Sequence, residues 1–500
     1  MKNRIVVNKE FIIGKIEKDL WGSFVEHMGR SVYGGIYEPA HEHSDEDGFR
    51  TDVMDAVKEL GVPLIRYPGG NFLSGYNWRD GVGKIRPVKL DLAWGQTEPN
   101  EVGLHEFCGW AEKVGAEVML SVNLGTGTPA SAAELVEYCN YGGATSLSDE
   151  RRANGREKPF GIKKWCLGNE MDGEWQICAM TAEEYGRKAA ETAKMMKWAD
   201  ENIRLVACGS SASELKTYPE WDRVILQHTY DYVDYLSLHR YYSYTPSGRT
   251  TDFMSAHVDL DASIKAVAAT VDYVRAYKRS KKEVKLSLDE WNIWHKTPEG
   301  ANENVYNDTY SDRWKIGPRR VENVYDLADA IAFAGLICAV INNADRVEIG
   351  CLAQLVNVIA PIYTENKGRM VKQSIYYPYK MAISEASGYA LQLAFSGEKV
   401  STDYGDTEKI YAACAYDGGV YKLFVINKSD EEEICDIDFQ ATSVKMTSRN
   451  EISGPLRAHN TFEDPFAVTP KAVLCEKKAG NSFNLSLAPY SFSLIRFEEI

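Results

Sequence analysis

The segment IKKWCLGNE, residues 162–170, ends a short apolar run on an amide and a carboxylate, Asn169 and Glu170. Runs of the same kind recur between residues 20 and 355, and most of the intervals between them carry apolar residues at helical spacings of three and four. The runs are LWGSFVEH (20–27), VPLIRYPGG (62–70), EVMLSVNLG (117–125), IKKWCLGNE (162–170), IRLVACGSS (203–211), YVDYLSLHRYY (232–242), EVKLSLDEWN (283–292) and RVEIGCLAQL (346–355). Eight strand–helix units in sequence predict the α/β class and a closed parallel (β/α)8 barrel.

An open, doubly wound sheet is the competing topology. It usually carries a G-x-G-x-x-G turn after its first strand, and LWGSFVEHMGRS has no such turn. The interval between the fifth and sixth runs, residues 214–231, has the least regular helical pattern. The apolar run AIAFAGLICAVI, which starts at Ala330, is too short to span a membrane and is typical of a buried helix.

The pattern changes after Tyr376, where runs of alternating apolar and polar residues are separated by turn sequences such as DGG and ISGP. This alternation of apolar and polar residues between turns predicts an antiparallel, all-β sandwich. The amphipathic start of the chain, RIVVNKEFIIGKI, is expected to add strands to it. We therefore expect a catalytic barrel over residues 18–375 and a jelly-roll-like accessory domain formed by residues 1–17 and 376–500.

Composition excludes several classes of partner. The 57 basic and 72 acidic residues give a net charge of −15, which argues against nucleic-acid and anionic-membrane partners and favours a neutral substrate. The first residues carry no signal-peptide pattern, and no apolar run reaches the ~18 residues of a membrane span. The ten cysteines form no C-x-x-C or Cys/His cluster, so no zinc or redox motif is predicted. We expect a cytoplasmic protein.

The active site of a β/α barrel lies at the carboxyl ends of its strands. One glutamate after a strand is usually a solvated loop residue. Here, however, most of the runs end on a carboxylate, amide, imidazole, guanidinium or phenol, which predicts one polar pocket. These strand-end residues are Glu26, His27, Arg66, Asn71, Asn169, Glu170, His239, Tyr241, Tyr242, Asp289, Glu290 and Gln354.

Glu170 and Glu290 end the fourth and seventh runs, so they face each other across the predicted barrel mouth. Glycosidic hydrolysis needs one carboxyl as general acid and another as nucleophile or base. A separation of roughly 5–5.5 Å indicates retention of anomeric configuration, and a wider gap indicates inversion. Glu290 should be ionised, Glu170 should carry the proton, and Tyr241 is placed to hydrogen-bond Glu290. Asn169 is placed to donate to a sugar hydroxyl beside the reacting carbon.

These motifs resemble glycoside hydrolase family 51, the retaining α-L-arabinofuranosidases. The resemblance covers most of residues 20–385 and the closing strand PYSFSLIRF, and the combination is far more specific than GNE or DEW alone. The matching stretches are WGSFVEHMGRSVYGGIYEP, RYPGGNFLSGYNWRDGVG, WGQTEPNEVGLHEFC, VNLGTGTPASAAELVEYCNY, WCLGNEMDG, YVDYLSLHRYY, LDEWNIWH and CLAQLVNVIAPI.

The resemblance implies that Glu170 is the acid/base and Glu290 the nucleophile. It also implies an intracellular hexamer that acts on arabinofuranosyl oligosaccharides in arabinan and hemicellulose degradation, without a cofactor or a metal. Arg240, where the family commonly has Gln, departs from the pattern and concerns fine specificity. The residues that the resemblance places around the substrate are Glu26, Asn71, Trp94, Asn169, Tyr241, Trp294 and Gln354.

Other polar residues near these motifs have simpler interpretations. His239 either orients the catalytic groups or is a structural histidine. Asp172 and Glu174 are expected to be loop acids, and Cys166 is expected to be packing. Metal ligation by Glu26, His27 and His239 is disfavoured by their spacing and by the family.

Three alternatives stay open at this stage. The same two-glutamate apparatus serves barrel glycosidases that act on β-xylosides or β-glucans. A non-catalytic carbohydrate-binding relative would be expected to lose one of the glutamates, and neither is lost. An isomerase or aldolase would need a metal cluster or a Schiff-base lysine at a strand end, and the runs above supply neither.

Overall fold

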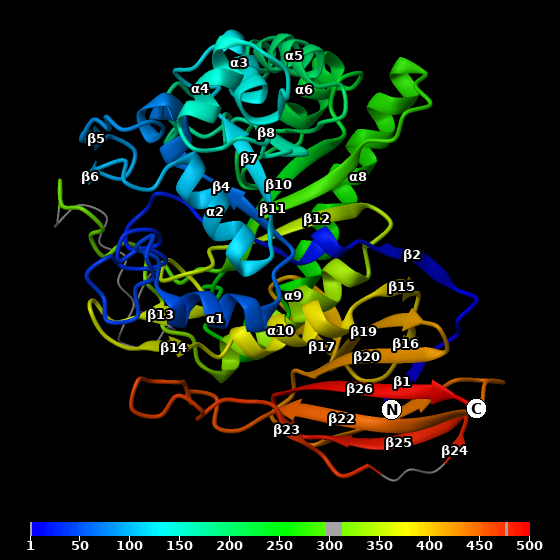
Figure 1. Ribbon diagram of the computed structural model, residues 1–500. Helices are drawn as coiled ribbons and strands as arrows, with labels where there is room; N and C mark the ends of the chain where they lie inside the picture. Colours follow the sequence, from blue (N-terminus) through cyan, green and yellow to red (C-terminus); the bar gives the residue numbers. More distant parts are fainter. Residues whose placement is uncertain (1–2, 297–312, 476–478) are drawn as a thin grey trace.

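The computed structural model describes residues 3–296, 313–475 and 479–500. Eight parallel strands close into a barrel, in which the last strand pairs with the first (Figure 1). Each strand coincides with one of the eight apolar runs, β11 extending one residue past its run, so the predicted barrel is confirmed. In order they are β3 (Gly22–Phe24), β4 (Leu64–Tyr67), β7 (Glu117–Val122), β8 (Lys164–Leu167), β9 (Arg204–Ala207), β10 (Tyr235–Tyr242), β11 (Lys285–Ile293) and β12 (Val347–Ala353).

Helices follow the barrel strands, and α6 lies in the interval with the least regular pattern. Thr181 and Glu184 form a capping box at the start of α5, which satisfies backbone N–H groups that the first helical turn leaves free. The helices are α1 (Thr51–Leu60), α2 (Leu104–Val114), α3 (Pro129–Asn140), α4 (Ser146–Ala153), α5 (Ala182–Ala199), α6 (Glu220–Thr229), α7 (Thr250–Phe253), α8 (His257–Lys278), α9 (Leu327–Ile341) and α10 (Tyr376–Glu385). No helix within the described ranges is long and apolar enough to cross a membrane.

Short elements lie at the end of the barrel where the carboxyl ends of the strands meet. They are the 3-10 helices η2 (Asn71–Gly75) and η3 (Trp78–Gly81) and the hairpins β5 (Lys89–Asp91) with β6 (Gln96–Glu98) and β13 (Ile362–Thr364) with β14 (Met370–Lys372). A further 3-10 helix, η1 (Lys18–Trp21), leads into β3.

The inside of the barrel is filled by alternate strand residues. Cys166 belongs to this buried interior cluster, so the thiol packs as expected, and it also contacts Asp289. The cluster consists of Phe24, Leu64, Met119, Cys166, Val206, Tyr235, Ile349, Cys351 and Ala353. The polar residues at the carboxyl ends of the strands therefore lie directly above this apolar interior of the barrel.

The second domain is a two-sheet sandwich, as predicted. One sheet has the order β16-β1-β21-β25, and the other runs β2-β15-β19-β20-β26-β22-β23, with β24 also on β22. Apolar side chains of both sheets, including Ile5 and Leu423, form a separate core between them. The strands are β1 (Asn3–Val6), β2 (Ile12–Ile16), β15 (Gly388–Leu391), β16 (Ala394–Ser396), β19 (Ile410–Asp417), β20 (Val420–Asn427), β21 (Glu433–Asp438), β22 (Val444–Ile452), β23 (Lys471–Ala472), β24 (Ala479–Gly480), β25 (Ser482–Leu487) and β26 (Ser491–Glu499), beside a hairpin of β17 (Lys399–Thr402) and β18 (Gly405–Glu408).

Helix α9 joins the two domains. All of its residues are buried, because one side packs on the barrel and the other on β19, β20 and β26 (Figure 1). This explains an apolar pattern without a polar face. Helix α10 packs against α1 and α9. We therefore propose that the barrel extends to about residue 385, whereas the sequence placed the boundary at residue 375.

Candidate active site

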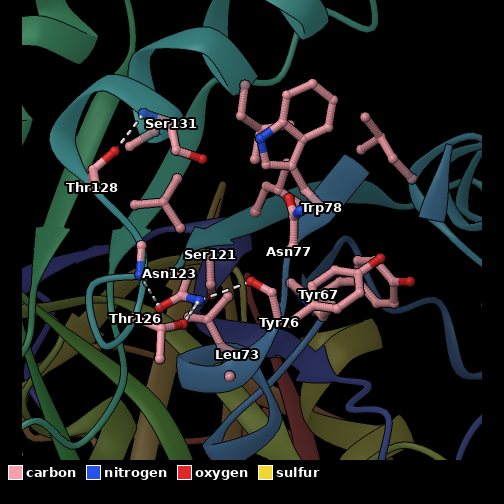
Figure 2. A pocket seen from close by; sticks show the side chains of 18 residues that line it. Tyr67, Leu73, Tyr76, Asn77, Trp78, Ser121, Asn123, Thr126, Thr128 and Ser131 are labelled. Carbon is pink, nitrogen blue, oxygen red and sulfur yellow. Dashed lines mark hydrogen bonds between the residues drawn. The ribbon is translucent and has the colours of Figure 1, made fainter. Parts of the chain in front are cut away.

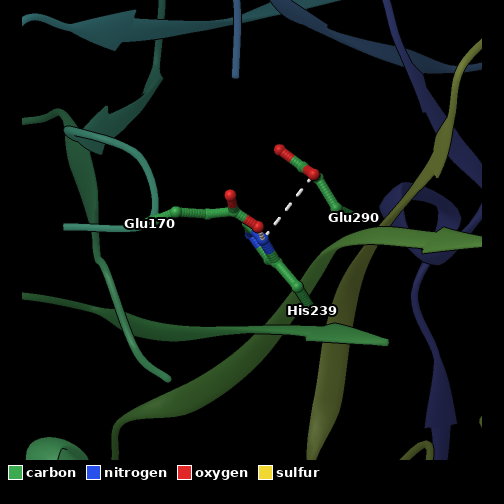
Figure 3. Close-up of side chains that lie close together, drawn as sticks. All are labelled: Glu170, His239 and Glu290. Carbon is green, nitrogen blue, oxygen red and sulfur yellow. Dashed lines mark hydrogen bonds and ion pairs between the residues drawn. The ribbon is translucent and has the colours of Figure 1, made fainter. Parts of the chain in front are cut away.

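Glu170, His239 and Glu290 meet at the carboxyl end of the barrel (Figure 3). One oxygen of each carboxyl and one ring nitrogen of His239 all lie within 4.8 Å of one another. Strands β8 and β11, which carry the two glutamates, are three positions apart in the barrel, and the register of β10 and β11 sets His239 beside Glu290. The fold thus brings together side chains that are up to 120 positions apart in sequence.

Glu290 is buried and held by two strong donors. The Nη1 atom of Arg66 lies 2.7 Å from its Oε1, and the hydroxyl of Tyr241 donates to its Oε2 over 2.8 Å. The hydrogen bond from Tyr241 is the one that the sequence led us to expect. A guanidinium and a phenol stabilise the ionised form of a carboxylate. Glu290 is therefore presented as a fixed anion.

Arg66, at the end of β4, links several strand ends. Its Nη2 donates to the Oδ1 of Asn169 over 2.6 Å, and its Nε lies 3.8 Å from Asp289. Burial alone would lower the pKa of Arg66, but the carboxylates of Asp289 and Glu290 raise it well above its ordinary value. Arg66 therefore stays charged and fixes the positions of Asn169 and Glu290 together.

Glu170 follows β8 on a strained turn. Gly168 and Glu170 have φ angles of 87° and 45°, and the second is unusual for a residue with a side chain. The Nε1 of Trp175 donates to its Oε2 over 2.6 Å, and the Nδ1 of His239 lies 2.9 Å from its Oε1. The side chain of Glu170 is 12% exposed, and Trp175 is 50% exposed. This carboxyl therefore faces the open mouth of the barrel.

His239 bridges three carboxylates. Its Nδ1 faces Glu170 and lies 3.6 Å from Glu290, while its Nε2 lies 3.0 Å from Asp289. Burial alone would lower the pKa of His239, but the surrounding carboxylates raise it well above its ordinary value. An imidazolium donates from both nitrogens and has no lone pair for a metal. This arrangement of two carboxyls around one imidazole is suited to proton transfer.

Glu26 forms the floor of the site beside Glu290. Its Oε1 accepts from the indole Nε1 of Trp94 at 2.8 Å and from the backbone N–H of Phe72 at 3.0 Å. Gln354 contacts its Oε2 at 3.4 Å. Burial, followed by the charge of Glu290, raises the pKa of Glu26 to about 8. A Cβ at Gly70 would lie 2.4 Å from this carboxylate, so only glycine fits there.

The remaining predicted residues line the same region. The amides of Asn71 and Asn169 lie 3.5 Å apart, and the ring of Trp294 packs edge-on against Tyr241, with 5.3 Å between centroids. The indole N–H of Trp294 has no protein partner among the described residues. Amides and aromatic edges of this kind recognise neutral polar ligands.

Structural contacts or solvent exposure account for Asp172, Glu174 and His27, none of which was expected to act in catalysis. Asp172 accepts from the backbone N–H of Ser211 and so ties the loop after β8 to the loop after β9, while Glu174 is exposed. His27 contacts Glu98 and the hydroxyl of Tyr67, away from Glu26. The disfavoured metal set is therefore not assembled.

Arg240 makes its side-chain contacts away from Glu170 and Glu290. It contacts Asp259 of α8 and the hydroxyl of Ser213, on the outer side of β10. The residue at position 240, where the family commonly has Gln, therefore changes contacts on the outer side of β10. It does not change the contacts among Glu170, His239 and Glu290.

The sequence named Arg66 and Asp289 only as strand-end residues, with no role assigned, and it did not point to Trp175 at all. Arg66 and Asp289 end their strand runs, which was a usable signal, but their partners depend on the barrel geometry. Trp175 lies five residues after Glu170 in an irregular loop, and no periodicity shows that it turns back onto the carboxyl.

Two family models match the chain. An α-L-arabinofuranosidase 1 domain covers residues 56–257, and an α-L-arabinofuranosidase C-terminal domain covers residues 289–491. An intracellular exo-α-(1→5)-L-arabinofuranosidase of Bacillus subtilis is 50% identical over 88% of this chain and 87% of its own length. The chain belongs to the α-L-arabinofuranosidases, of glycoside hydrolase family 51.

Other members of the family support the same placement. An exo-α-(1→6)-L-arabinofuranosidase of Bifidobacterium longum is 43% identical over 99% of this chain and 97% of its own length. The structure of a family 51 α-L-arabinofuranosidase from B. longum superposes with a TM-score of 0.93 at 36% identity and covers all of both chains. An arabinose complex of the Thermotoga maritima enzyme gives 0.87 at 33% identity, also over the whole of both chains. The chain is a glycoside hydrolase with the fold of this family.

Proposed function

We propose that this enzyme removes terminal α-L-arabinofuranosyl residues from the non-reducing ends of arabino- and arabinoxylo-oligosaccharides, with retention of configuration. The observation that carries the proposal is the approach of Glu170 and Glu290 to within 4.8 Å at the barrel mouth. Retaining glycosidases hold their carboxyls roughly 5–5.5 Å apart, whereas inverting enzymes leave roughly 6.5–9.5 Å for a water. One oxygen of each carboxyl within 4.8 Å of the other is compatible with double displacement, and membership of this retaining family supports it.

In the first step Glu290 attacks the anomeric carbon, and the bond to the leaving oxygen breaks as Glu170 transfers its proton to that oxygen. The product is a glycosyl ester of Glu290 and a free alcohol. In the second step Glu170 takes a proton from water as that water attacks the anomeric carbon and releases Glu290. Two inversions give net retention.

The surrounding residues support these steps in different ways. Arg66 and Tyr241 hold the Glu290 carboxylate in one orientation, and His239 and Trp175 do the same for Glu170. As positive charge develops on the sugar ring, the buried carboxylate at Glu290 stabilises it. Orientation and charge together lower the barrier.

We place the sugar ring in the region bounded by the predicted substrate residues. The carboxyl of Glu26 and the amides of Asn71, Asn169 and Gln354 are the hydroxyl-binding groups. Trp94 and Trp294 form the apolar walls. Glu26 with its pKa near 8 can donate as well as accept, which suits a ligand with many hydroxyls.

The biological setting is proposed from the relatives. Enzymes named as intracellular and exo-acting from B. subtilis and Streptomyces lividans are 50% and 42% identical to this chain. We propose a cytoplasmic enzyme that finishes the degradation of arabinan and hemicellulose fragments. We further propose a homo-oligomer, a hexamer, which light scattering of the purified protein tests directly.

The substrate is tested by comparing nitrophenyl α-L-arabinofuranoside with nitrophenyl β-D-xyloside, followed by arabino-oligosaccharides of defined linkage. We expect kcat/KM to favour the arabinofuranoside strongly and single arabinose units to be released from chain ends. A preference for the xyloside, or release of internal fragments, would overturn the proposal. Linkage analysis of the remaining oligosaccharide then ranks (1→2), (1→3), (1→5) and (1→6) bonds.

A further inference from the structure

A second cavity opens at the same end of the barrel, separated from the active site by η2. It has a volume of about 330 Å³ and lies between β4, β7, η3 and the start of α3 (Figure 2). This volume is within the range of small-molecule pockets, roughly 300–1,000 Å³. Helix η2 begins with Asn71 on the active-site side and contributes Leu73 and Gly75 to the wall of this cavity.

The lining is free of charge. In a chain in which 26% of residues are charged, none of the residues that surround the cavity is Asp, Glu, Lys or Arg. Arg79 packs on the face of Trp78 but is paired with Glu134 and Glu150 and does not line the cavity. A ligand of this cavity must therefore be neutral, because it would find no counter-charge.

The polar and apolar groups are arranged as a neutral, hydroxyl-rich ligand requires. Buried apolar side chains, among them Leu120, Val122 and Leu135, line the cavity together with the aromatic residues Tyr76 and Trp78 (Figure 2). Hydroxyl and amide side chains also line the cavity, and several of them are already hydrogen-bonded within the protein. They belong to Asn77, Asn123, Thr126, Thr128 and Ser131. Aromatic faces with a polar rim match the C–H faces and hydroxyls of a sugar.

One buried donor is unused. The indole N–H of Trp78 has no hydrogen-bond partner among the described residues, although Trp78 is only 8% exposed. A buried donor without a partner is unfavourable unless a ligand or water satisfies it. Trp110 and Trp291 also have unpaired N–H groups, but these residues are fully buried and do not line this cavity. The Nε1 atom itself is not exposed to the cavity, so a sugar hydroxyl reaches this donor only after a small rotation of the indole ring.

We propose that this cavity is a second, non-catalytic saccharide site that binds a neutral pentose unit. The neutral polyol class follows from the cavity itself, and the choice of a pentose rests on the proposed function. Hydrogen bonds from Thr126 to the backbone oxygen of Ser74 and from Asn123 to that of Tyr76 connect the cavity wall to η2. An occupied cavity therefore also supports the helix that carries Asn71.

The test uses the Glu290→Ala protein labelled with 5-fluorotryptophan and titrated with arabinotriose, which this variant does not hydrolyse. Trp78→Phe assigns the fluorine resonance of Trp78. We expect that resonance to shift saturably, with a midpoint different from that of Trp94 in the active site, while Trp110 and Trp291 stay unchanged. A Trp78 resonance that does not move while Trp94 saturates overturns the proposal.

A second variant keeps the test decisive. Ala132 lines the cavity from α3, and Ala132→Leu fills it without touching the catalytic residues. We expect this variant to abolish the Trp78 shift and to raise KM for arabinotriose about threefold or more, with nitrophenyl α-L-arabinofuranoside unaffected. An unchanged Trp78 titration in Ala132→Leu would also contradict the site. The Trp78 resonance is measured on a variant that does not hydrolyse the ligand. If the wild-type enzyme failed to hydrolyse arabinotriose, that result would therefore contradict the proposed function but not the second saccharide site.

Discussion

The carboxyl ends of β8 and β11 each present a glutamate, but in different surroundings. At the end of β11, Glu290 is buried and accepts from a guanidinium and a phenol, at 2.7 and 2.8 Å. Beyond the end of β8, Glu170 sits on a left-handed turn and accepts from a half-exposed indole at 2.6 Å. His239 lies between them and contacts both.

This difference assigns two roles to one type of side chain. A carboxylate that two strong donors hold in one orientation is suited to be the nucleophile. A carboxyl at the open mouth can exchange protons with the leaving group and with water. Because His239 contacts Glu170 through one nitrogen and Asp289 through the other, it fixes the position of the Glu170 carboxyl.

Removal of the buried glutamate should have the largest effect. We expect Glu290→Ala to lower kcat/KM for nitrophenyl α-L-arabinofuranoside by at least about 10⁴-fold, because no group then attacks the anomeric carbon. Added azide should restore turnover and give the β-configured arabinofuranosyl azide. Turnover near the wild-type level without azide would contradict the assignment of the nucleophile.

Removal of the exposed glutamate should depend on the leaving group. Glu170→Ala should lower kcat/KM by about 10²–10⁴-fold for arabino-oligosaccharides, whose alkoxide must be protonated, and much less for the nitrophenyl substrate. Azide should give the α-configured product here. Glu174→Ala, which changes an exposed acid four residues away, is the matched control and should behave as wild type. Equal losses on both substrates would count against a general-acid role.

Substitution of Arg66 tests whether the Glu290 carboxylate depends on the positive charge beside it. Arg66→Met leaves Asp289 and Glu290 buried without their guanidinium, so we expect kcat to fall about 10²-fold and the free energy of unfolding to fall by about 3 kcal/mol. Denaturant unfolding and steady-state kinetics measure the two effects. Arg369→Met, at an exposed ion pair, should change neither. Full activity in Arg66→Met would show that Tyr241 alone suffices.

Glu26 affects stability rather than catalysis, through a pH dependence of the free energy of unfolding. Its pKa is about 8 in the folded state against 4.5 when exposed, so the folded state retains this proton over a range in which the unfolded state loses it. Its favourable contribution is therefore complete below about pH 4.5 and is lost as the pH rises towards 8. Relative to Glu26→Gln, the wild type should lose roughly 3–5 kcal/mol of unfolding free energy across this window.

The control for this pH series is Glu174→Gln, because Glu174 is exposed. We expect the difference between this variant and the wild type to stay constant from pH 4.5 to 8. If Glu26→Gln gives the same flat difference, Glu26 is ionised throughout the range, and its burial beside Glu290 does not hold the proton.

Much of this architecture could be predicted from the sequence because strand runs and their polar ends are local features. All eight barrel strands coincide with predicted runs, and the two glutamates lie opposite each other as expected from their positions in the order. Helix α6 was less clear because Tyr218 and Pro219 interrupt the pattern just before it begins.

Contacts that depend on loops could not be predicted in the same way. Trp175 reaches Glu170 only because the chain reverses after a left-handed turn. The bridging position of His239 depends on a register shift in β10 between Ser237 and His239. Helix α10 lies on the sandwich side of the boundary predicted at residue 375 and on the barrel side of the boundary we propose, because a change in sequence pattern marks the start of the strands and not the end of the barrel layer.

The most direct test of the two-glutamate account is the anomeric configuration of the first product. Hydrolysis of nitrophenyl α-L-arabinofuranoside is followed by proton NMR before the released arabinose mutarotates. The account predicts that α-L-arabinofuranose appears first, since Glu170 and Glu290 lie within 4.8 Å and act in two displacements. Initial appearance of the β anomer would show single displacement by water and would contradict Glu290 as the nucleophile.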